Sequence, residues 1–473
     1  MKLFIKIYFY HLNPKNSMYV IILNIGYLKI FHFNLGVHMN KNEDIKKETG
    51  IYENPLWTKD FTIITLGTVI SKLGNAISGF AMSLLVLDLY KSTLMYALCM
   101  CVFSLSNAIV PALAGPYLDK FSRKKTIYTL DFLSAALYML FGILLWKNSN
   151  VNYIIIILVS LILGVINSIY SVAYDSLYPL LVTKGNYTKA YSISSTLETL
   201  TMFMVPVSAY LYNTIGIGPL FLLDAVSFFI AAVFETQIRA KEEYMEIRTE
   251  KFTRSQYIED FKQGIEYLKS EKGLLAITIY FAITTFAGSS YQTLSLPYFK
   301  ETYTSGEYMF IWVMGFGVLG RFIGGAIHYK FKYPTDKKFT IALLVYFTIS
   351  LIDGSMLYFP IIIMMILSFI EGIMGVTSYN IRVSATQSYV PHEKKGRFNG
   401  IFLMAITASM TLGQLISGAL GDIVPKRLVV SAFMIFNLIG VIVVMYKNRN
   451  HVKPIYNRPV SYTHLTLPTT PYV

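Results

Sequence analysis

The sequence predicts an all-α polytopic membrane protein with twelve transmembrane helices, arranged as two six-helix halves. Three observations support this fold class. The 473 residues are 54% hydrophobic and only 14% charged, and a mean hydropathy of +0.50 is too high for a water-soluble protein of ordinary charge content. Twelve apolar runs are long enough to cross a bilayer, and segments of the first half recur in the second half at a nearly constant offset.

Each predicted span is an apolar run of about 20 residues, the length that crosses a bilayer as a helix. A helix is expected because a backbone in lipid must satisfy its own hydrogen bonds. The first six spans cover 61–88, 93–116, 126–146, 152–176, 189–212 and 216–238. The last six cover 274–298, 308–328, 339–358, 361–384, 397–420 and 427–446.

The longest polar interruption separates an N-terminal half at 61–238 from a C-terminal half at 273–446. This linker, 239–272, is rich in charge and carries apolar residues at helical spacing, namely Tyr257, Phe261, Ile265 and Leu268. The pattern indicates a cytosolic linker that contains an amphipathic helix at the membrane surface. A solvated linker is the alternative.

Both ends of the chain differ from the rest. Residues 1–38 are aromatic and basic without a small-residue cleavage site, and Met39 opens a polar stretch typical of a cytosolic N-terminus. We expect 1–38 to be a non-native or mis-assigned extension, with a signal peptide or an additional helix as the alternative. Residues 39–60 would then form the cytosolic N-terminus and 447–473 a cytosolic tail. The segment 460–473 resembles translated adapter sequence and is expected to be artefactual.

The net charge of +14 is distributed in short tracts between apolar runs. A nucleic-acid-binding protein gathers its basic residues on a solvated face, so we expect no nucleic-acid partner. With a cytosolic N-terminus, the loops after spans 2, 4, 8 and 10 hold 13 lysines and arginines, whereas the opposite loops hold 5. The positive-inside rule therefore predicts a multi-pass protein of the cell membrane with both termini cytosolic and lipids as partners.

The two halves correspond in sequence. Gly115 precedes Gly325 by 210 residues, and the run 119–121, DKF, is matched at the same offset by 329–331, YKF. The loop 182–190 matches 390–398 at an offset of 208. Agreement in corresponding loops indicates a parallel repeat, an arrangement found in one class of transporters.

The segment 115–125, GPYLDKFSRKK, resembles the signature of the major facilitator superfamily, Gly-x-x-x-Asp-Arg-x-Gly-Arg-Lys, which lies between helices 2 and 3 of that family. Lys120 and Ser122 depart from the signature. The runs 56–89, 218–232 and 390–400 are similar to the exporter-type branch that includes macrolide and siderophore efflux proteins. The resemblance covers about residues 55–447 and implies a secondary active transporter that works by alternating access.

The resemblance also implies a cytosolic gate between the two halves. Asp119 can face the N-terminus of helix 11 near Gly396, where the helix dipole favours an anion, and Arg123 can pair with Asp175 at the end of helix 4. The expected gating residues are Gly115, Asp119, Arg123, Lys124 and Asp175.

The lysines of this loop have a second interpretation, because basic residues beside a membrane are attracted to anionic headgroups. Lys120, Lys124 and Lys125 are expected to anchor the loop in this way. In the second half Tyr329 replaces the aspartate, so we expect the gate to depend mainly on the N-terminal half.

Ionisable residues at membrane depth are costly and indicate function. Glu198 in helix 5 and Glu371 in helix 10 are the proton-coupling candidates, with structural pairing as the alternative. Lys72 in helix 1 can pair with one of them or recognise an anionic group. Asp131 and Asp224 lie on helices that are peripheral in the family, so we expect them to pack or to form hydrogen bonds.

Helices 1, 4, 7 and 10 line the central cavity in this family. On these helices, aromatic and polar residues with few fixed charges predict a cavity for a small amphipathic molecule. The candidates are Lys72, Asn75, Asn167, Tyr170, Tyr174, Ser289, Tyr291, Gln292, Tyr379 and Asn380. Arg321 in helix 8 needs an anionic partner or a wet cavity, and the Gly-x-x-x-Gly pair of Gly320 and Gly324 indicates close helix contact.

The leading functional hypothesis is a monomeric transporter that exports a small amphipathic molecule, such as a drug, macrolide or siderophore, in exchange for protons of the proton gradient. A facilitator that imports a small solute, a polytopic membrane transferase and a transporter-like sensor are the alternatives. Of a glycine-rich helix 5 stretch found in many proton-driven exporters, this chain keeps only Pro206, which weighs against antiport.

The sequence offers no chemistry for an enzyme. The external loops are too short to hold an acid–base or metal cluster, and no phosphate-binding loop for ATP is present. Cys99 and Cys101 lie two apart, so a helix turns them to different faces. We therefore expect no covalent chemistry, no cofactor and no metal site.

Overall fold

The computed structural model describes residues 7–10, 17–24, 27–34, 55–118, 121–148, 151–183, 186–240, 242, 254–330, 333–391 and 394–458. The chain divides into two compact units, Met1–Pro55 and Leu56–Val473. In the first, β1 (Ile7–Tyr10), β2 (Ser17–Asn24) and β3 (Tyr27–Asn34) form an antiparallel sheet in the order β1-β2-β3. The described residues of 1–38 thus form strands rather than an additional helix.

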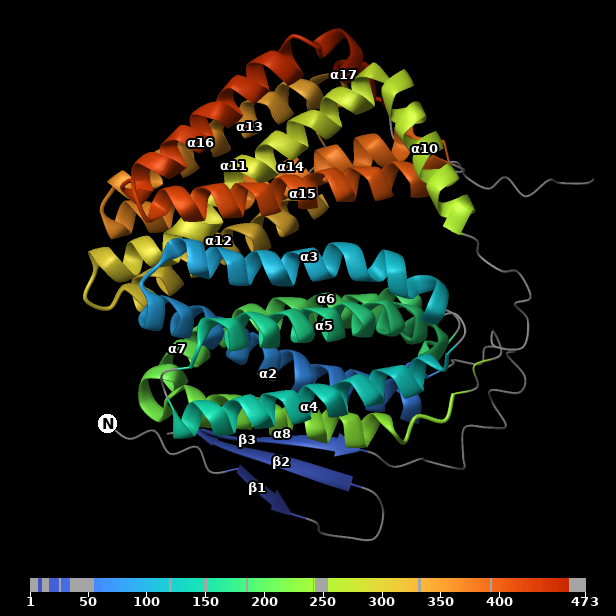
Figure 1. Ribbon diagram of the computed structural model, residues 1–473. Coiled ribbons are helices and arrows are strands. Elements are labelled where there is room, and N and C mark those ends of the chain that lie inside the picture. Colours follow the sequence, from blue (N-terminus) through green and yellow to red (C-terminus); the bar gives the residue numbers. More distant parts are fainter. Residues whose placement is uncertain are drawn as a thin grey trace, which may run out of the picture. The chain divides into compact units, whose positions relative to one another are not determined.

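The second unit is built from helices (Figure 1). Those before the linker are α2 (Lys59–Tyr90), α3 (Thr93–Leu118), α4 (Arg123–Lys147), α5 (Tyr153–Leu181), α6 (Tyr187–Met202), α7 (Met204–Ile215) and α8 (Ile217–Glu235). In the linker lies α10 (Arg254–Ser270). After it come α11 (Lys272–Thr302), α12 (Gly306–Lys330), η1 (Thr335–Lys337), α13 (Lys338–Ser355), η2 (Met356–Tyr358), α14 (Ile361–Tyr389), α15 (Lys395–Gly421), α16 (Lys426–Gly440), the π-helical η4 (Val441–Tyr446) and α17 (Arg449–Tyr456).

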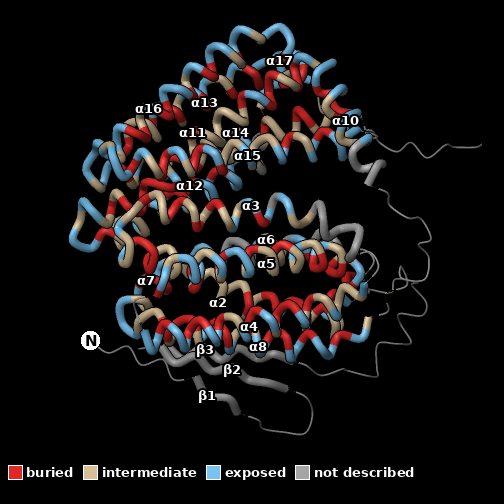
Figure 2. The backbone as a smooth tube through the Cα atoms, viewed as in Figure 1, coloured by how far each residue is buried: buried red, intermediate tan, exposed pale blue. Residues whose placement is uncertain are grey.

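Eleven helices of the described residues are long and apolar enough to cross a membrane. Large apolar side chains lie on their outer surfaces, for example Phe322, Leu140 and Ile362, which are 71%, 68% and 68% exposed. Buried residues concentrate where helices face one another (Figure 2). A helix bundle with an apolar exterior is stable in lipid, so the chain is a multi-pass membrane protein.

The fifth predicted span, 189–212, is interrupted. It forms α6 and α7, which have 16 and 12 residues and meet at Phe203. Pro206 lacks a backbone N–H, and its ring crowds the carbonyl of Met202 four residues earlier. Each part is therefore shorter than a membrane span, which explains why eleven helices of the described residues, rather than twelve, meet the length requirement.

Polar side chains begin several of the helices by binding free backbone N–H groups. The hydroxyl of Thr58 accepts from the N–H of Phe61 at 3.2 Å, and the amide oxygen of Asn152 accepts from the N–H of Ile154 at 2.9 Å. Between α7 and α8, Gly216 adopts φ 79°, a conformation that glycine takes without strain. These residues fix short connections between neighbouring helices.

Two groups of helices each surround apolar clusters, and the cluster around Leu84 also includes Leu296 of α11. In α2–α8, one buried cluster contains Leu84, Phe141 and Phe221 and another Phe61, Ile127 and Leu177. In the second group, α11–α17, the clusters are built around residues of α11, α13 and α16. Figure 1 shows the two groups as separate stacks, with α3 next to α15 where they meet, and α12 contacts α7.

Glycines let α12 approach α14 closely. A Cβ added to Gly320 would collide with the carbonyl oxygen of Phe369, and one added to Gly324 would lie 3.0 Å from the Cα of Ile373. Gly372 on α14 has the same relation to the carbonyl oxygen of Gly317. The Gly-x-x-x-Gly pair therefore makes the close helix contact that the sequence indicated.

Candidate functional site

A cavity of about 950 Å³ lies mainly among α2–α8. The second group of helices closes part of it, with Gln292 from α11, Met314 from α12, and Met410 and Gln414 from α15. Both halves of the protein therefore form its wall. Such a cavity is large enough to hold a drug-sized molecule.

The structure places six of the predicted cavity residues in this lining. They are Lys72, Asn75, Asn167, Tyr170, Tyr174 and Gln292. All lie on α2, α5 and α11, the first, fourth and seventh spans of the bundle. The predicted gating residue Asp175 also lines the cavity.

The other four predicted cavity residues lie outside this lining. Ser289 is buried against α15, where a Cβ on Gly413 would collide with its hydroxyl. Tyr291 turns toward the core of the C-terminal half, and its hydroxyl lies 3.0 Å from the Sδ of Met356. Tyr379 and its neighbour Asn380 lie on α14, where the ring of Tyr379 stacks with Arg382. Position within a helix was predictable, but the rotation of α11 and α14 was not.

Aromatic rings form one side of the cavity. The rings of Tyr170 and Tyr174 stack with centroids 6.0 Å apart, and Tyr138 stacks on Phe228 at 5.4 Å. The ammonium group of Lys72 lies 5.8 Å from the ring centroid of Tyr174, within the range of a cation–π interaction. This surface suits a ligand with a large apolar body.

Two carboxyl groups meet beside the cavity. Asp131 on α4 and Glu235 on α8 are each 1% exposed, and their side chains lie close enough to interact. The hydroxyl of Tyr170 donates to Oε1 of Glu235 at 3.3 Å. Asp131 is packed in the interior, as the sequence predicted, and it also lines the cavity. Glu235 escaped the sequence analysis, although an acid inside an apolar span was a visible signal.

Asp224 forms hydrogen bonds within the N-terminal half, as the sequence predicted. Its Oδ1 accepts from the hydroxyl of Ser227 at 2.9 Å. A Cβ on Gly74 of α2 would collide with both of these groups. The glycine thus provides the space in which Asp224 and Ser227 meet α2.

Of the proton-coupling candidates, Glu371 lies outside the described cavity lining. Glu371 on α14 lies near Arg321 of α12 and Asp353 of α13, close enough for their charges to interact. Arg321 therefore has the acidic neighbours that an arginine deep in a membrane-spanning helix requires. Asp353 is an acidic residue of this group that the sequence analysis did not identify. The side chain of Glu198 lies outside the described residues.

The structure describes Arg123 of the predicted gate and shows one further residue, Glu242, bound beside it. Nη1 of Arg123 donates to the carbonyl oxygen of Ser176 at 3.1 Å, next to Asp175. The carboxylate of Glu242 accepts from the backbone N–H of Arg123 at 2.7 Å and from the hydroxyl of Ser122. Glu242 therefore caps the positive N-terminus of α4. It was missed because nothing in the linker sequence specifies a return to this helix.

The remaining gate residues are placed only in part. Lys124 Nζ donates to the carbonyl oxygen of Ala240 at 3.1 Å, so this lysine binds the chain rather than serving only as a lipid anchor. Asp119 lies outside the described residues, and of Gly115 only its backbone position within α3 is described. At the N-terminus of α15, Gly396 is exposed and a Cβ there would meet open space.

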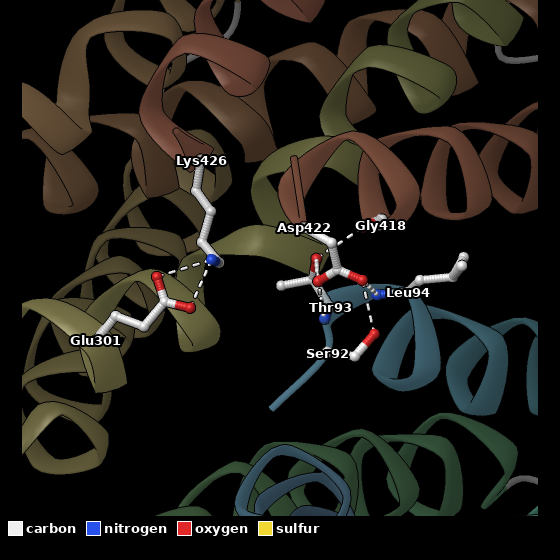
Figure 3. A network of polar contacts seen from close by, with 7 residues as sticks. All are labelled: Ser92, Thr93, Leu94, Glu301, Gly418, Asp422 and Lys426. Carbon is white, nitrogen blue, oxygen red and sulfur yellow. Dashed lines mark hydrogen bonds and ion pairs between the residues drawn. The ribbon is translucent and has the colours of Figure 1, made fainter. Parts of the chain in front are cut away.

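Asp422 joins the two halves at the opposite end of α15 (Figure 3). Its Oδ1 accepts from the backbone N–H of Thr93 at 2.6 Å and from the hydroxyl of Thr93 at 2.7 Å. Its Oδ2 accepts from the hydroxyl of Ser92 at 2.6 Å and from the N–H of Leu94 at 3.2 Å. The carboxylate therefore binds the free N–H groups at the start of α3.

Burial acts to raise the pKa of Asp422, but the hydrogen bonds from Ser92, Thr93 and Leu94 outweigh it, so the pKa is lowered from its ordinary value. The carboxylate thus stays ionised at neutral pH. Ion pairs lie beside it: Lys300 with Asp88, which also joins the halves, and Lys426 with Glu301 at 2.6 Å. This set of contacts is called the Asp422 clasp below.

Known proteins resemble this chain in sequence and in fold. The family model described as "Major Facilitator Superfamily" matches residues 64–378. An uncharacterized MFS-type transporter of Bacillus subtilis (strain 168), YkuC, is 26% identical over 372 residues, which are 75% of this chain and 84% of that protein. Macrolide efflux protein A of Streptococcus pyogenes is 22% identical over 251 residues, 52% of this chain and 61% of that protein. The chain thus spans about three fifths of the length of this macrolide relative.

Solved structures share the fold. The nucleoside transporter NupG, in a mutant form, aligns with a TM-score of 0.64 and 12% identity, covering 83% of this chain and 99% of that one. A bacterial homologue of the iron transporter ferroportin, in an inward-facing state, aligns with a TM-score of 0.61 and 14% identity, covering 84% and 98%.

Proposed function

Because the chain belongs to the Major Facilitator Superfamily, and is therefore a transporter and not an enzyme, we propose that it exports a small amphipathic molecule in exchange for protons. The observation that carries this proposal is the 950 Å³ cavity with walls from both halves. Stacked tyrosines bind apolar surface, and Lys72, Asn75 and Gln292 offer a few polar contacts. A macrolide has this combination of a large apolar ring and sparse polar groups.

The direction of the cavity follows from the charge distribution. The basic loops and α10 belong at the cytosolic side by the positive-inside rule, which places both termini in the cytosol of a cell-membrane protein. The Asp422 clasp then lies on the external side and holds the halves together there. Gly396, at the cytosolic end of α15, has open space around it. These features support an inward-facing arrangement, and we propose that the carrier works as a monomer.

In this proposal the cytosolic gate closes when the clasp opens. Arg123, already bound next to Asp175, and Asp119 would form the contact with α15 in the outward-facing state. Glu242 holds the start of α4 in place for this. We expect Asp119→Asn to slow turnover without lowering expression, because an amide loses the charge that the N-terminus of α15 attracts.

Radiolabelled erythromycin in inverted membrane vesicles tests export. A pH gradient, acidic inside, is expected to drive accumulation that a protonophore abolishes. Uptake only in right-side-out vesicles would show an importer, and gradient-independent equilibration would show a facilitator. Either result would contradict the proposal.

The same assay examines the proposed proton-coupling residues. They are Glu198 on helix 5 and Glu371 on helix 10 in the second half. Glu198→Gln and Glu371→Gln are expected to lower gradient-driven uptake, whereas Glu259→Gln, on the exposed face of α10, serves as the matched control. If both variants keep normal gradient-driven uptake, coupling resides elsewhere.

A further inference from the structure

Asp131 and Glu235 carry buried polar atoms that the fold alone does not account for. Each side chain is 1% exposed, and within the described part of the chain Oδ2 of Asp131 and Oε2 of Glu235 have no hydrogen-bond partner. An unpartnered charged oxygen in an apolar interior is strongly unfavourable. Two such atoms on neighbouring carboxyl groups indicate a binding site for a small ligand.

Neither carboxyl group can donate a hydrogen bond to the other while both are ionised, because ionised carboxylates only accept. Two ionised carboxylates in contact would also repel strongly in a poorly polarisable interior. Among the described residues, no group of three or more acids, histidines or cysteines could hold a metal ion. The ligand that fits this pair is therefore a proton.

The groups that face the pair come from α2, α5 and α8. Tyr170 of α5 donates to Glu235 at 3.3 Å, and Asp224 of α8 adds a second acid near Asp131. On α2, Gly67 leaves space for Glu235, since a Cβ there would lie 3.1 Å from its Oε1. Lys72 of α2 is the cation in the described cavity lining, which also contains Asp131 and Asp175.

The cavity gives the pair access to water. Asp131 lines it, whereas Glu235 lies behind, so a proton can pass between water in the cavity and the pair through Asp131. Release leaves two negative charges on the pair, and rebinding restores one shared proton. The state of the pair therefore depends on whether the cavity is open to one side of the membrane or closed.

We propose that Asp131 and Glu235 bind one shared proton, and that exchange of this proton with the cavity couples substrate movement to the proton gradient. The inference rests on the proposed function and adds a second proton site to the candidates Glu198 and Glu371. Only a proton moves in this step, from the carboxyl pair to water and back, and no bond of the substrate changes.

The test uses the purified full chain in proteoliposomes with radiolabelled erythromycin as the probe. For one proton exchanged per substrate, each pH unit of gradient supports up to about tenfold accumulation. Asp131→Asn and Glu235→Gln are expected to abolish this accumulation while erythromycin counterflow without a gradient persists. Glu259→Gln, on the exposed face of α10, is the control and is expected to retain accumulation. Gradient-driven accumulation in both pair variants would overturn the proposal.

A second measurement separates this inference from the proposed function. Infrared spectra of the reconstituted protein without substrate are expected to show a protonated carboxyl band at neutral pH that weakens in Asp131→Asn and in Glu235→Gln. If erythromycin is not transported at all, the export proposal fails, and the band still decides the proton site. An unchanged band in these variants would refute the shared proton. Each variant removes the pair, so one that folds is sufficient.

Discussion

Gly74 shows how a single missing side chain positions polar groups inside the bundle. A Cβ there would collide with Asp224 and Ser227, whereas a Cβ on Gly79 of the same helix would meet nothing within 4 Å. We expect Gly74→Ala to lower stability by about 1–3 kcal/mol through overpacking. Thermal unfolding of the purified protein in detergent measures the effect.

The matched control for this prediction is Gly79→Ala. Alanine has a better helix propensity than glycine by about 0.5–1 kcal/mol, so this variant should unfold at the same temperature or slightly higher. Equal midpoints for the two variants would mean that Asp224 does not pack against α2 as described.

The sequence identified Lys72, Asn75 and Tyr170 as cavity residues because their helices are known to face the centre in the family. It did not identify Glu235 and Glu242. The role of each depends on a partner distant in the chain, Asp131 for one and the start of α4 for the other. Such pairing is decided by how helices pack, which a single sequence does not encode in any local pattern.

At the scale of helices, α12 and α14 form the contact most dependent on small residues. Gly320→Ala places a methyl group on the carbonyl of Phe369, whereas Gly315→Ala on the same helix meets open space. We expect Gly320→Ala to cost about 1–3 kcal/mol, because helix association in membranes relies on close packing.

Unfolding in mixed micelles with increasing dodecyl sulfate, followed by circular dichroism, measures this cost. Gly315→Ala should leave the midpoint unchanged. A lowered midpoint in both variants would indicate a general loss at α12 rather than its contact with α14.

Most helices follow the predicted spans to within a few residues, because length and hydropathy alone specify a crossing segment. The break between α6 and α7 was not predicted, although Pro206 was in view. A proline within a span can kink or interrupt a helix, and neighbouring helices decide which. For the same reason the sequence marked α10 as helical but could not show that Gly264 packs against Arg397 and Ile401 of α15.

At the scale of the whole molecule, the Asp422 clasp controls how readily the halves separate. Cys101 reports on this, since its Sγ lies 3.4 Å from Oε1 of Gln414 across the interface and is 2% exposed. In a Cys99→Ser background, Asp422→Asn should speed labelling of Cys101 by N-ethylmaleimide about fivefold, the effect of losing about 1 kcal/mol of charge-assisted hydrogen bonding.

Asp336→Asn, in the η1 segment away from the clasp, should label at the parent rate. Unchanged labelling of Asp422→Asn would show that Asp422 does not limit separation of the halves.

The pH dependence of the clasp follows from the lowered pKa of Asp422. A depressed pKa stabilises the contact above the ordinary aspartate value of about 3.9, and this contribution is lost only as pH falls through the lower folded value. Spin labels at the exposed positions Thr214 and Thr304, one on each half, should keep one distance between pH 8 and pH 5. A distance that widens in that range would assign control to another group.

The sequence by itself determined the membrane environment, the crossing segments, the family resemblance and six residues of the cavity wall, because hydropathy and short motifs are local properties of the chain. Tertiary structure decided which face of α11 and α14 turns inward, that Asp131 meets Glu235, and that Asp422 binds the start of α3. These features depend on the rotation and approach of helices far apart in sequence. In a membrane, the rotation of a helix is set by its packing against other helices, and hydropathy predicts little about it.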